Sequence, residues 1–66
     1  MEILVNGKST ELSDGMNLAD LLRQHDLPPT RVAIELNRQI VSRKQYAETQ
    51  LKRGDQVEIV TFVGGG

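Results

Sequence analysis

The segment from Asn17 to Leu27 constrains the fold most, because its apolar residues have the spacing of a helix. Its leucines share one helical face, with His25 next in register: Leu18, Leu21 and Leu22. Asn17 is a suitable N-cap, and Pro28 and Pro29 are expected to end the helix. A helix of about nine residues is not stable alone. The leucine face must therefore pack against another part of the chain.

The segments on either side of this helix have the composition of strands. Extended structure is predicted at Glu2 to Asn6, Lys8 to Leu12, Val32 to Leu36, Ile40 to Val41 and Val57 to Val63. The pair Asn6-Gly7 is typical of a tight hairpin, because both residues tolerate positive φ. Val57 to Val63 is the most β-prone stretch of the chain.

The order of these elements predicts the fold class. A lone amphipathic helix needs a sheet face to cover, which gives an α+β domain with two layers. The order strand, strand, helix, strand, short strand, strand is the β-grasp arrangement, a mixed sheet of four to five strands packed on one helix. The apolar first and last strands are expected to be central. Residues 1–63 would form the domain, and residues 64–66 a flexible C-terminal glycine tail.

Composition excludes several classes of function. The 66 residues include no cysteine and one histidine, so a disulfide, a thiolate metal site and a cysteine nucleophile are excluded. A net charge of −1 gives no strong basic field for nucleic acid. No apolar run approaches the ~20 residues of a membrane span, and the first residues lack the features of a signal peptide. We expect a cytoplasmic protein that is not itself an enzyme.

The C-terminal Gly64-Gly65-Gly66 is the most distinctive chemical feature. Glycine offers a terminal carboxylate with no side chain beside it, so such a tail can thread a narrow channel into another protein's active site. The carboxylate is a poor electrophile and must first be activated, for example by adenylation. By composition alone, a frayed end or a cloning remnant explains the glycines equally well.

The last strand predicts a docking surface. If Val57 and Ile59 face the helix, period-two alternation sends Val60 and Phe62 to the opposite face, with Leu4 beside them. That face has no cover in a two-layer fold, so these three side chains would form an exposed apolar patch of the kind that binds proteins. The alternative is scattered surface hydrophobes without a role.

The remaining polar residues are interpreted as structural. His25 has no nucleophile beside it and is expected to be a surface or partly buried side chain rather than a base. Arg43-Lys44 and Lys52-Arg53 are expected to be solvated turn charges, although they could contact an acidic partner.

Several segments, in order along the whole chain, resemble the ThiS family of sulfur carriers of thiamine biosynthesis. They are Met1 to Gly7, Ala33 to Asn37, Ile40-Val41-x-Arg43-x-x-Tyr46, Leu51-x-x-Gly54-Asp55-x-Val57-Glu58-Ile59 and Val63 to Gly66. The resemblance implies a ubiquitin-like β-grasp fold. It also implies that an E1-like adenylating enzyme of the ThiF type activates Gly66, with Gly64 and Gly65 as the threading segment.

The same resemblance implies the partners. ATP and Mg²⁺ would bind to the adenylating enzyme, because this chain has no phosphate-binding loop and no carboxylate cluster. A sulfur donor enzyme would convert the carboxylate to a thiocarboxylate, and a thiazole synthase of the ThiG type would take the sulfur. A molybdopterin-type carrier, a protein modifier joined to lysines and a plain β-grasp binding module remain as alternatives.

Overall fold

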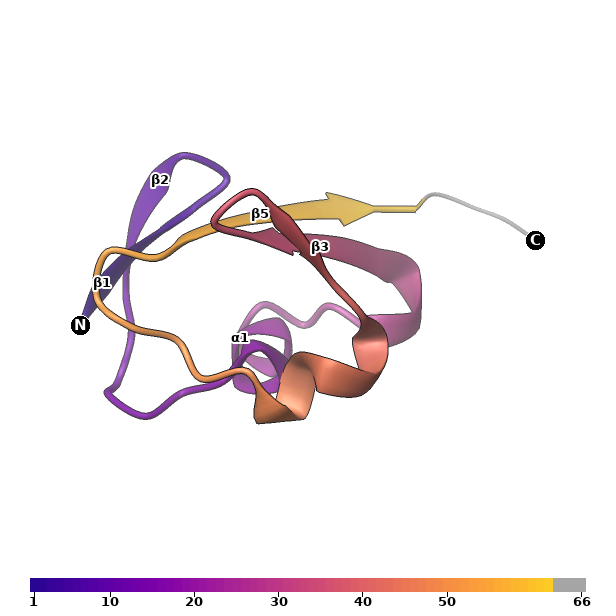
Figure 1. The fold of residues 1–66 in the computed structure, drawn as a ribbon, viewed down its shortest axis with the longest axis horizontal. Helices are drawn as coiled ribbons and strands as arrows, with labels where there is room; N and C mark the ends of the chain where they lie inside the picture. The colour runs from indigo at the N-terminus through magenta and orange to yellow at the C-terminus, as the bar shows by residue number, and fades with distance from the viewer. Residues whose placement is uncertain (63–66) are drawn as a thin grey trace.

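The computed structural model describes residues 1–62 and has two layers (Figure 1). The strands are β1 (Glu2–Val5), β2 (Lys8–Glu11), β3 (Val32–Leu36), β4 (Gln39–Val41) and β5 (Gln56–Thr61). The helices are α1 (Leu18–Gln24) and two 3-10 segments, η1 (Pro29–Arg31) and η2 (Arg43–Glu48). The predicted sequence of elements is confirmed.

The strands form a five-stranded sheet in the order β2-β1-β5-β3-β4. β5 pairs parallel with β1 and antiparallel with β3, so the sheet is mixed and the last strand is its centre. β1 lies directly beside β5, which confirms that the first and last strands are both internal. α1 and η2 lie together on one side of the sheet, and the other side carries no helix in the described residues (Figure 1).

The core lies between the sheet and α1. Its buried side chains are Ile3, Val5, Leu12, Leu18, Leu21, Leu22, Val32, Ile34, Tyr46, Leu51, Val57 and Ile59. Aliphatic residues dominate, and Tyr46 and Leu51 anchor the polar segment that follows β4. Because no charged or polar side chain is buried within residues 1–62, the fold rests on apolar packing there.

α1 is shorter than the sequence predicts. Its start is as expected: Asn17 accepts a hydrogen bond from the Asp20 amide, and the Asp20 carboxylate accepts one from the Asn17 amide. Its end is different, because the helix stops at Gln24 rather than running to the prolines. Asp26 adopts φ +55°, the Asp26 amide bonds to the Arg23 carbonyl, and the Leu27 amide bonds to the Leu22 carbonyl. This Schellman motif ends the helix before Pro28 can act.

Two asparagines hold β5 in register. Asn6 and Asn37 end β1 and β3 with φ of 50° and 51°, in tight hairpin turns. The Asn6 side chain accepts from the Ile59 amide at 2.7 Å and donates to the Ile59 carbonyl at 3.2 Å. The Asn37 side chain accepts from the Gln56 amide at 2.9 Å. Each side-chain amide therefore continues the ladder where the neighbouring backbone turns away.

No helix among residues 1–62 is long and apolar enough to cross a membrane. The longest described helix, α1, has seven residues, whereas a bilayer span requires ~20 apolar residues.

Candidate functional site

The end of β5 presents apolar side chains on the uncovered face of the sheet. Val57 and Ile59 are buried against α1, whereas Val60 and Phe62 are 59% and 54% exposed. The Phe62 amide donates to the Arg31 carbonyl at 2.8 Å, so the chain keeps its extended course one residue beyond the strand. The predicted alternation of β5 is confirmed, and it brings Phe62 to the last described position before the glycines.

Neighbouring strands enlarge this surface. Ala33 lies opposite Val60 in the ladder between β3 and β5, and Ile40 of β4 is 82% exposed. We name Ala33, Ile40, Val60 and Phe62 the outer patch. An open depression of about 300 Å³ at its margin is lined partly by outer-patch residues and partly by η1, η2 and the core beneath; its lining is Pro29, Thr30, Val32, Ala33, Ile34, Ile40, Val41, Arg43, Tyr46 and Phe62. The surface therefore offers both exposed apolar area and a hollow that a partner side chain could enter.

Leu4 does not lie beside the rest of the predicted patch. Its side chain faces the uncovered side and is 37% exposed, as expected. However, β1 pairs with β5 so that Leu4 lies opposite Gln56, four residues before Val60. Four residues of a strand span about 13 Å. The expectation of one contiguous patch that includes Leu4 is therefore wrong, because alternation fixes the face but not the register.

Two members of the outer patch, Ala33 and Ile40, are absent from the candidate residues proposed from the sequence. Alternation within Val32 to Leu36 places Ala33 on the outward face, so the sequence pattern alone is sufficient to identify this residue. The sequence predicts that Ile40 lies in a strand but does not indicate which face of the sheet its side chain takes. Its direction depends on its pairing with Glu35, which the hairpin register supplies.

The other residues proposed from the sequence lie in different parts of the molecule. Gly64, Gly65 and Gly66 lie outside the described residues. His25 is exposed and caps the end of α1, where its Nδ1 lies 3.1 Å from the Leu21 carbonyl oxygen. Arg43 lines the depression beside the outer patch, whereas Lys44, Lys52 and Arg53 are exposed. No group of three His, Cys, Asp or Glu side chains suited to a metal ion occurs in the described part of the chain.

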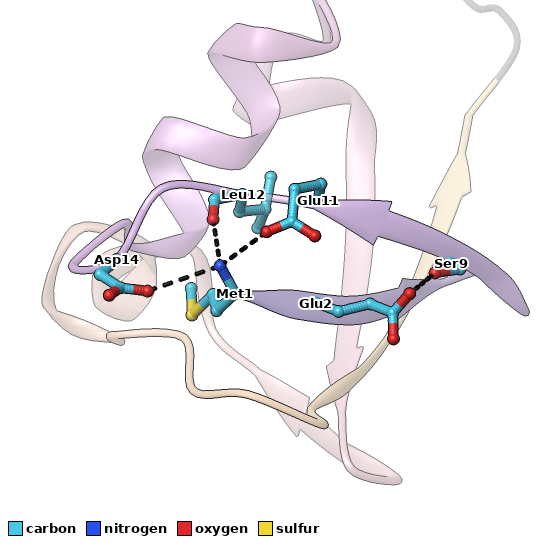
Figure 2. A network of polar contacts seen from close by, with 6 residues as sticks. All are labelled: Met1, Glu2, Ser9, Glu11, Leu12 and Asp14. Carbon is cyan, nitrogen blue, oxygen red and sulfur yellow. Dashed lines mark hydrogen bonds and ion pairs between the residues drawn. The ribbon is translucent and has the colours of Figure 1, made fainter.

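The amino terminus forms a separate polar network at the opposite end of the sheet (Figure 2). The Met1 ammonium donates to the Leu12 carbonyl at 2.6 Å and to Glu11 Oε2 at 2.9 Å, with Asp14 Oδ1 at 3.5 Å. The hydrogen bond to Glu11 raises the pKa of this amine above its ordinary value of 8.0, and the charges of Glu11 and Asp14 add to the effect. The network joins the start of β1 to the end of β2.

A second pKa shift occurs at the helix start. The hydrogen bond from the Asn17 amide lowers the pKa of Asp20 below its ordinary value of 3.8, and Arg23 lowers it further. Asp20 thus remains a carboxylate under ordinary conditions and supports the start of α1. Neither this group nor the amino terminus lies on the uncovered face, so both serve the fold rather than the outer patch.

Known proteins resemble this chain in both sequence and fold. The ThiS family model matches residues 3–66. A sulfur carrier protein ThiS from Bacillus subtilis is 38% identical over 63 residues, which cover 94% of this chain and 96% of that protein. The crystal structure of a thiamine biosynthesis protein (ThiS) from Geobacter metallireducens matches with a TM-score of 0.85 at 33% identity, covering 100% of both chains.

The chain also resembles part of a larger protein. A thiazole synthase from Magnetococcus marinus is 39% identical over 66 residues, so all of this chain is aligned. The chain spans only 20% of the length of that enzyme, and the same share of a second thiazole synthase from Paramagnetospirillum magneticum. The match to the family model over almost the whole chain, and the full-length match to the solved structure, agree with the β-grasp topology described above. This chain belongs to the ThiS family.

Proposed function

We propose that this chain is a sulfur carrier for thiamine biosynthesis and that the carboxylate of Gly66 carries the sulfur. Support comes from the family match, which extends through the terminal glycines. The observation that carries the proposal is the position of β5. This central strand carries exposed apolar side chains at Val60 and, one residue past its end, at Phe62, and in the sequence only Val63 separates Phe62 from Gly64 to Gly66.

The proposed chemistry has two steps. A Gly66 carboxylate oxygen attacks the α-phosphorus of ATP, which forms an acyl adenylate and releases pyrophosphate. Sulfur at the oxidation level of sulfide then attacks the activated carbonyl carbon and displaces AMP, which leaves a thiocarboxylate. ATP and Mg²⁺ are bound by the adenylating enzyme, and this chain acts as its co-substrate. Side chains near the reacting carboxyl carbon of Gly66 would hinder its entry to a narrow site. The preceding residues Gly64 and Gly65 have no side chains and so leave the way clear.

We assign the partners by the same reasoning. An E1-like adenylating enzyme of the ThiF type and a sulfur donor enzyme would load the carrier, and a thiazole synthase of the ThiG type would unload it. The thiazole synthases that contain a region similar to this chain support the last of these partners, because in them the two parts share one polypeptide. Val60 and Phe62 are the proposed docking residues for the adenylating enzyme.

An isotope-exchange assay tests the activation step. The adenylating enzyme is incubated with ATP, Mg²⁺ and labelled pyrophosphate, and the carrier is added at increasing concentration. We expect exchange of label into ATP to require the carrier and to be absent with a chain that lacks Gly66. Because Gly66 lies beyond the described domain, thermal unfolding of the shortened chain is the control for intact folding. Exchange that persists without Gly66 would contradict the proposal.

A further inference from the structure

The uncovered face of the sheet carries an unusual pair of charges. Glu35 of β3 and Glu58 of β5 lie directly opposite each other in the antiparallel ladder. Both are exposed, and their strand neighbours Ile34, Val57 and Ile59 are buried against the helix. Both carboxylates therefore face outward from the same part of the sheet.

This arrangement opposes folding. Like charges directly opposite each other across two strands are destabilising. The ion pairs among residues 1–62 link Met1 to Glu11 and Asp14, and Asp20 to Arg23, so none of them neutralises Glu35 or Glu58. Residues 63–66 are valine and glycine and have no cationic side chain to offer. The acidic pair thus forms no ion pair with a cation among residues 1–62.

Apolar side chains of the outer patch flank the acidic pair on two sides, towards β4 and towards the end of β5. Ile40 lies opposite Glu35 on the β4 side. Val60 follows Glu58 by two residues on the same face, with Ala33 opposite it. Two carboxylates thus lie beside apolar side chains, three residues before the end of β5 at Thr61. An arginine suits such a surface, because its methylene groups pack on apolar area while its guanidinium donates to two carboxylates.

We propose that the adenylating enzyme docks on this face with an arginine that bridges Glu35 and Glu58. This inference rests on the proposed function. An enzyme that joins an anionic carboxylate to ATP must bring two anions together, so its catalytic site needs positive charge, and an arginine beside that site on the docking surface would extend the same positive field. The acidic pair complements that charge and sets the position of β5 on the enzyme. Removal of the carboxylates should stabilise the folded carrier, because their repulsion is lost. It should also weaken binding to the enzyme, because the arginine loses its acceptors.

The test uses neutral substitutions of the same shape. We compare wild type, Glu35→Gln, Glu58→Gln and the double variant for affinity to the adenylating enzyme by titration calorimetry, at low and high salt. Urea unfolding of each free carrier gives its stability. Glu48→Gln is the matched control, because Glu48 is also exposed but lies on η2, on the helix side of the sheet. Affinity for the thiazole synthase is measured in parallel.

We expect the double variant to bind the adenylating enzyme about tenfold or more weakly, as for a charge pair lost from an interface. Its urea midpoint should equal or exceed that of wild type, its affinity should depend less on salt than that of wild type, and Glu48→Gln should match wild type. Unchanged affinity, a lowered urea midpoint, or a loss confined to the thiazole synthase would overturn the inference. If wild-type carrier itself supports no pyrophosphate exchange, the proposed function fails instead.

Discussion

Replacement of Phe62 by alanine separates docking from folding. Phe62 is 54% exposed, so somewhat less than half of its side chain is covered by its own domain. Full burial of a phenylalanine is worth about 1.5–3 kcal/mol, so its removal should lower the free energy of unfolding by about 1 kcal/mol. The uncovered part is about 100 Å² of a side chain that buries 150–250 Å². At ~25 cal/mol per Å², its burial by a partner contributes up to about 2.5 kcal/mol to binding.

Burial of somewhat more than half of this uncovered area gives an expected loss of affinity of about tenfold, which corresponds to about 1.4 kcal/mol. Calorimetry with the adenylating enzyme gives the affinity, and urea unfolding gives the stability. Leu27→Ala is the control, because Leu27 is half-buried against the core and should lower stability without weakening binding. Pyrophosphate exchange with Phe62→Ala should recover at high carrier concentration, since Gly66 is unchanged. Unchanged affinity, or a domain that unfolds without Phe62, would refute this reasoning.

Further predictions concern the fold. Leu21 is fully buried, so Leu21→Ala should lower the free energy of unfolding by about 2–5 kcal/mol, and a denaturation loss below about 1 kcal/mol would contradict its core position. The pKa of the Met1 amine is raised from 8.0, so its stabilising contribution is complete below pH 8.0 and is lost as pH rises through the raised value. Glu11→Gln should reduce this loss of stability at alkaline pH, measured as melting temperature against pH. An unchanged dependence on pH would contradict the role of the hydrogen bond between Met1 and Glu11. The pKa of Asp20 is lowered from 3.8, so its contribution is present above that pH and is lost on further acidification. Asn17→Ala should cost about 1 kcal/mol in chemical denaturation, because it removes the side chain that accepts from the Asp20 amide, and a fully stable variant would show that the cap is dispensable. Asp20→Asn should weaken the acid dependence, and an unchanged acid profile would contradict its assignment to Asp20.

Much of the fold follows from local chemistry. The capping residues and the leucines of α1 are recognisable because a helix start and a helical face each depend on a few neighbouring residues. The hairpin at Asn6-Gly7 is predictable for the same reason. The end of α1 is not, because Asp26 adopts a left-handed conformation that sequence assigns mainly to glycine or asparagine. Pro28 and Pro29 therefore set only the last position at which the helix could end, and the helix ends before it, at Gln24.

The candidate site is predictable only in part. Alternation along β5 correctly places Val60 and Phe62 outward, since facing direction is a property of one strand. Which side chains meet across strands depends on register, which involves residues far apart in sequence. For this reason the separation of Leu4 from Val60, and the opposition of Glu35 and Glu58, emerge only from the pairing of β5 with β1 and β3.

The central claim is that sulfur is carried on Gly66, and intact mass with fragmentation tests it most directly. The chain is expressed with the adenylating and sulfur donor enzymes and analysed beside a chain that lacks Gly66. We expect the full chain to gain the mass difference between one sulfur and one oxygen, in a fragment that contains Gly66, while the shortened chain gains nothing. The chain has no cysteine, so a side-chain persulfide cannot produce the same signal. An unmodified mass with active partner enzymes, or sulfur added elsewhere in the chain, would contradict the claim.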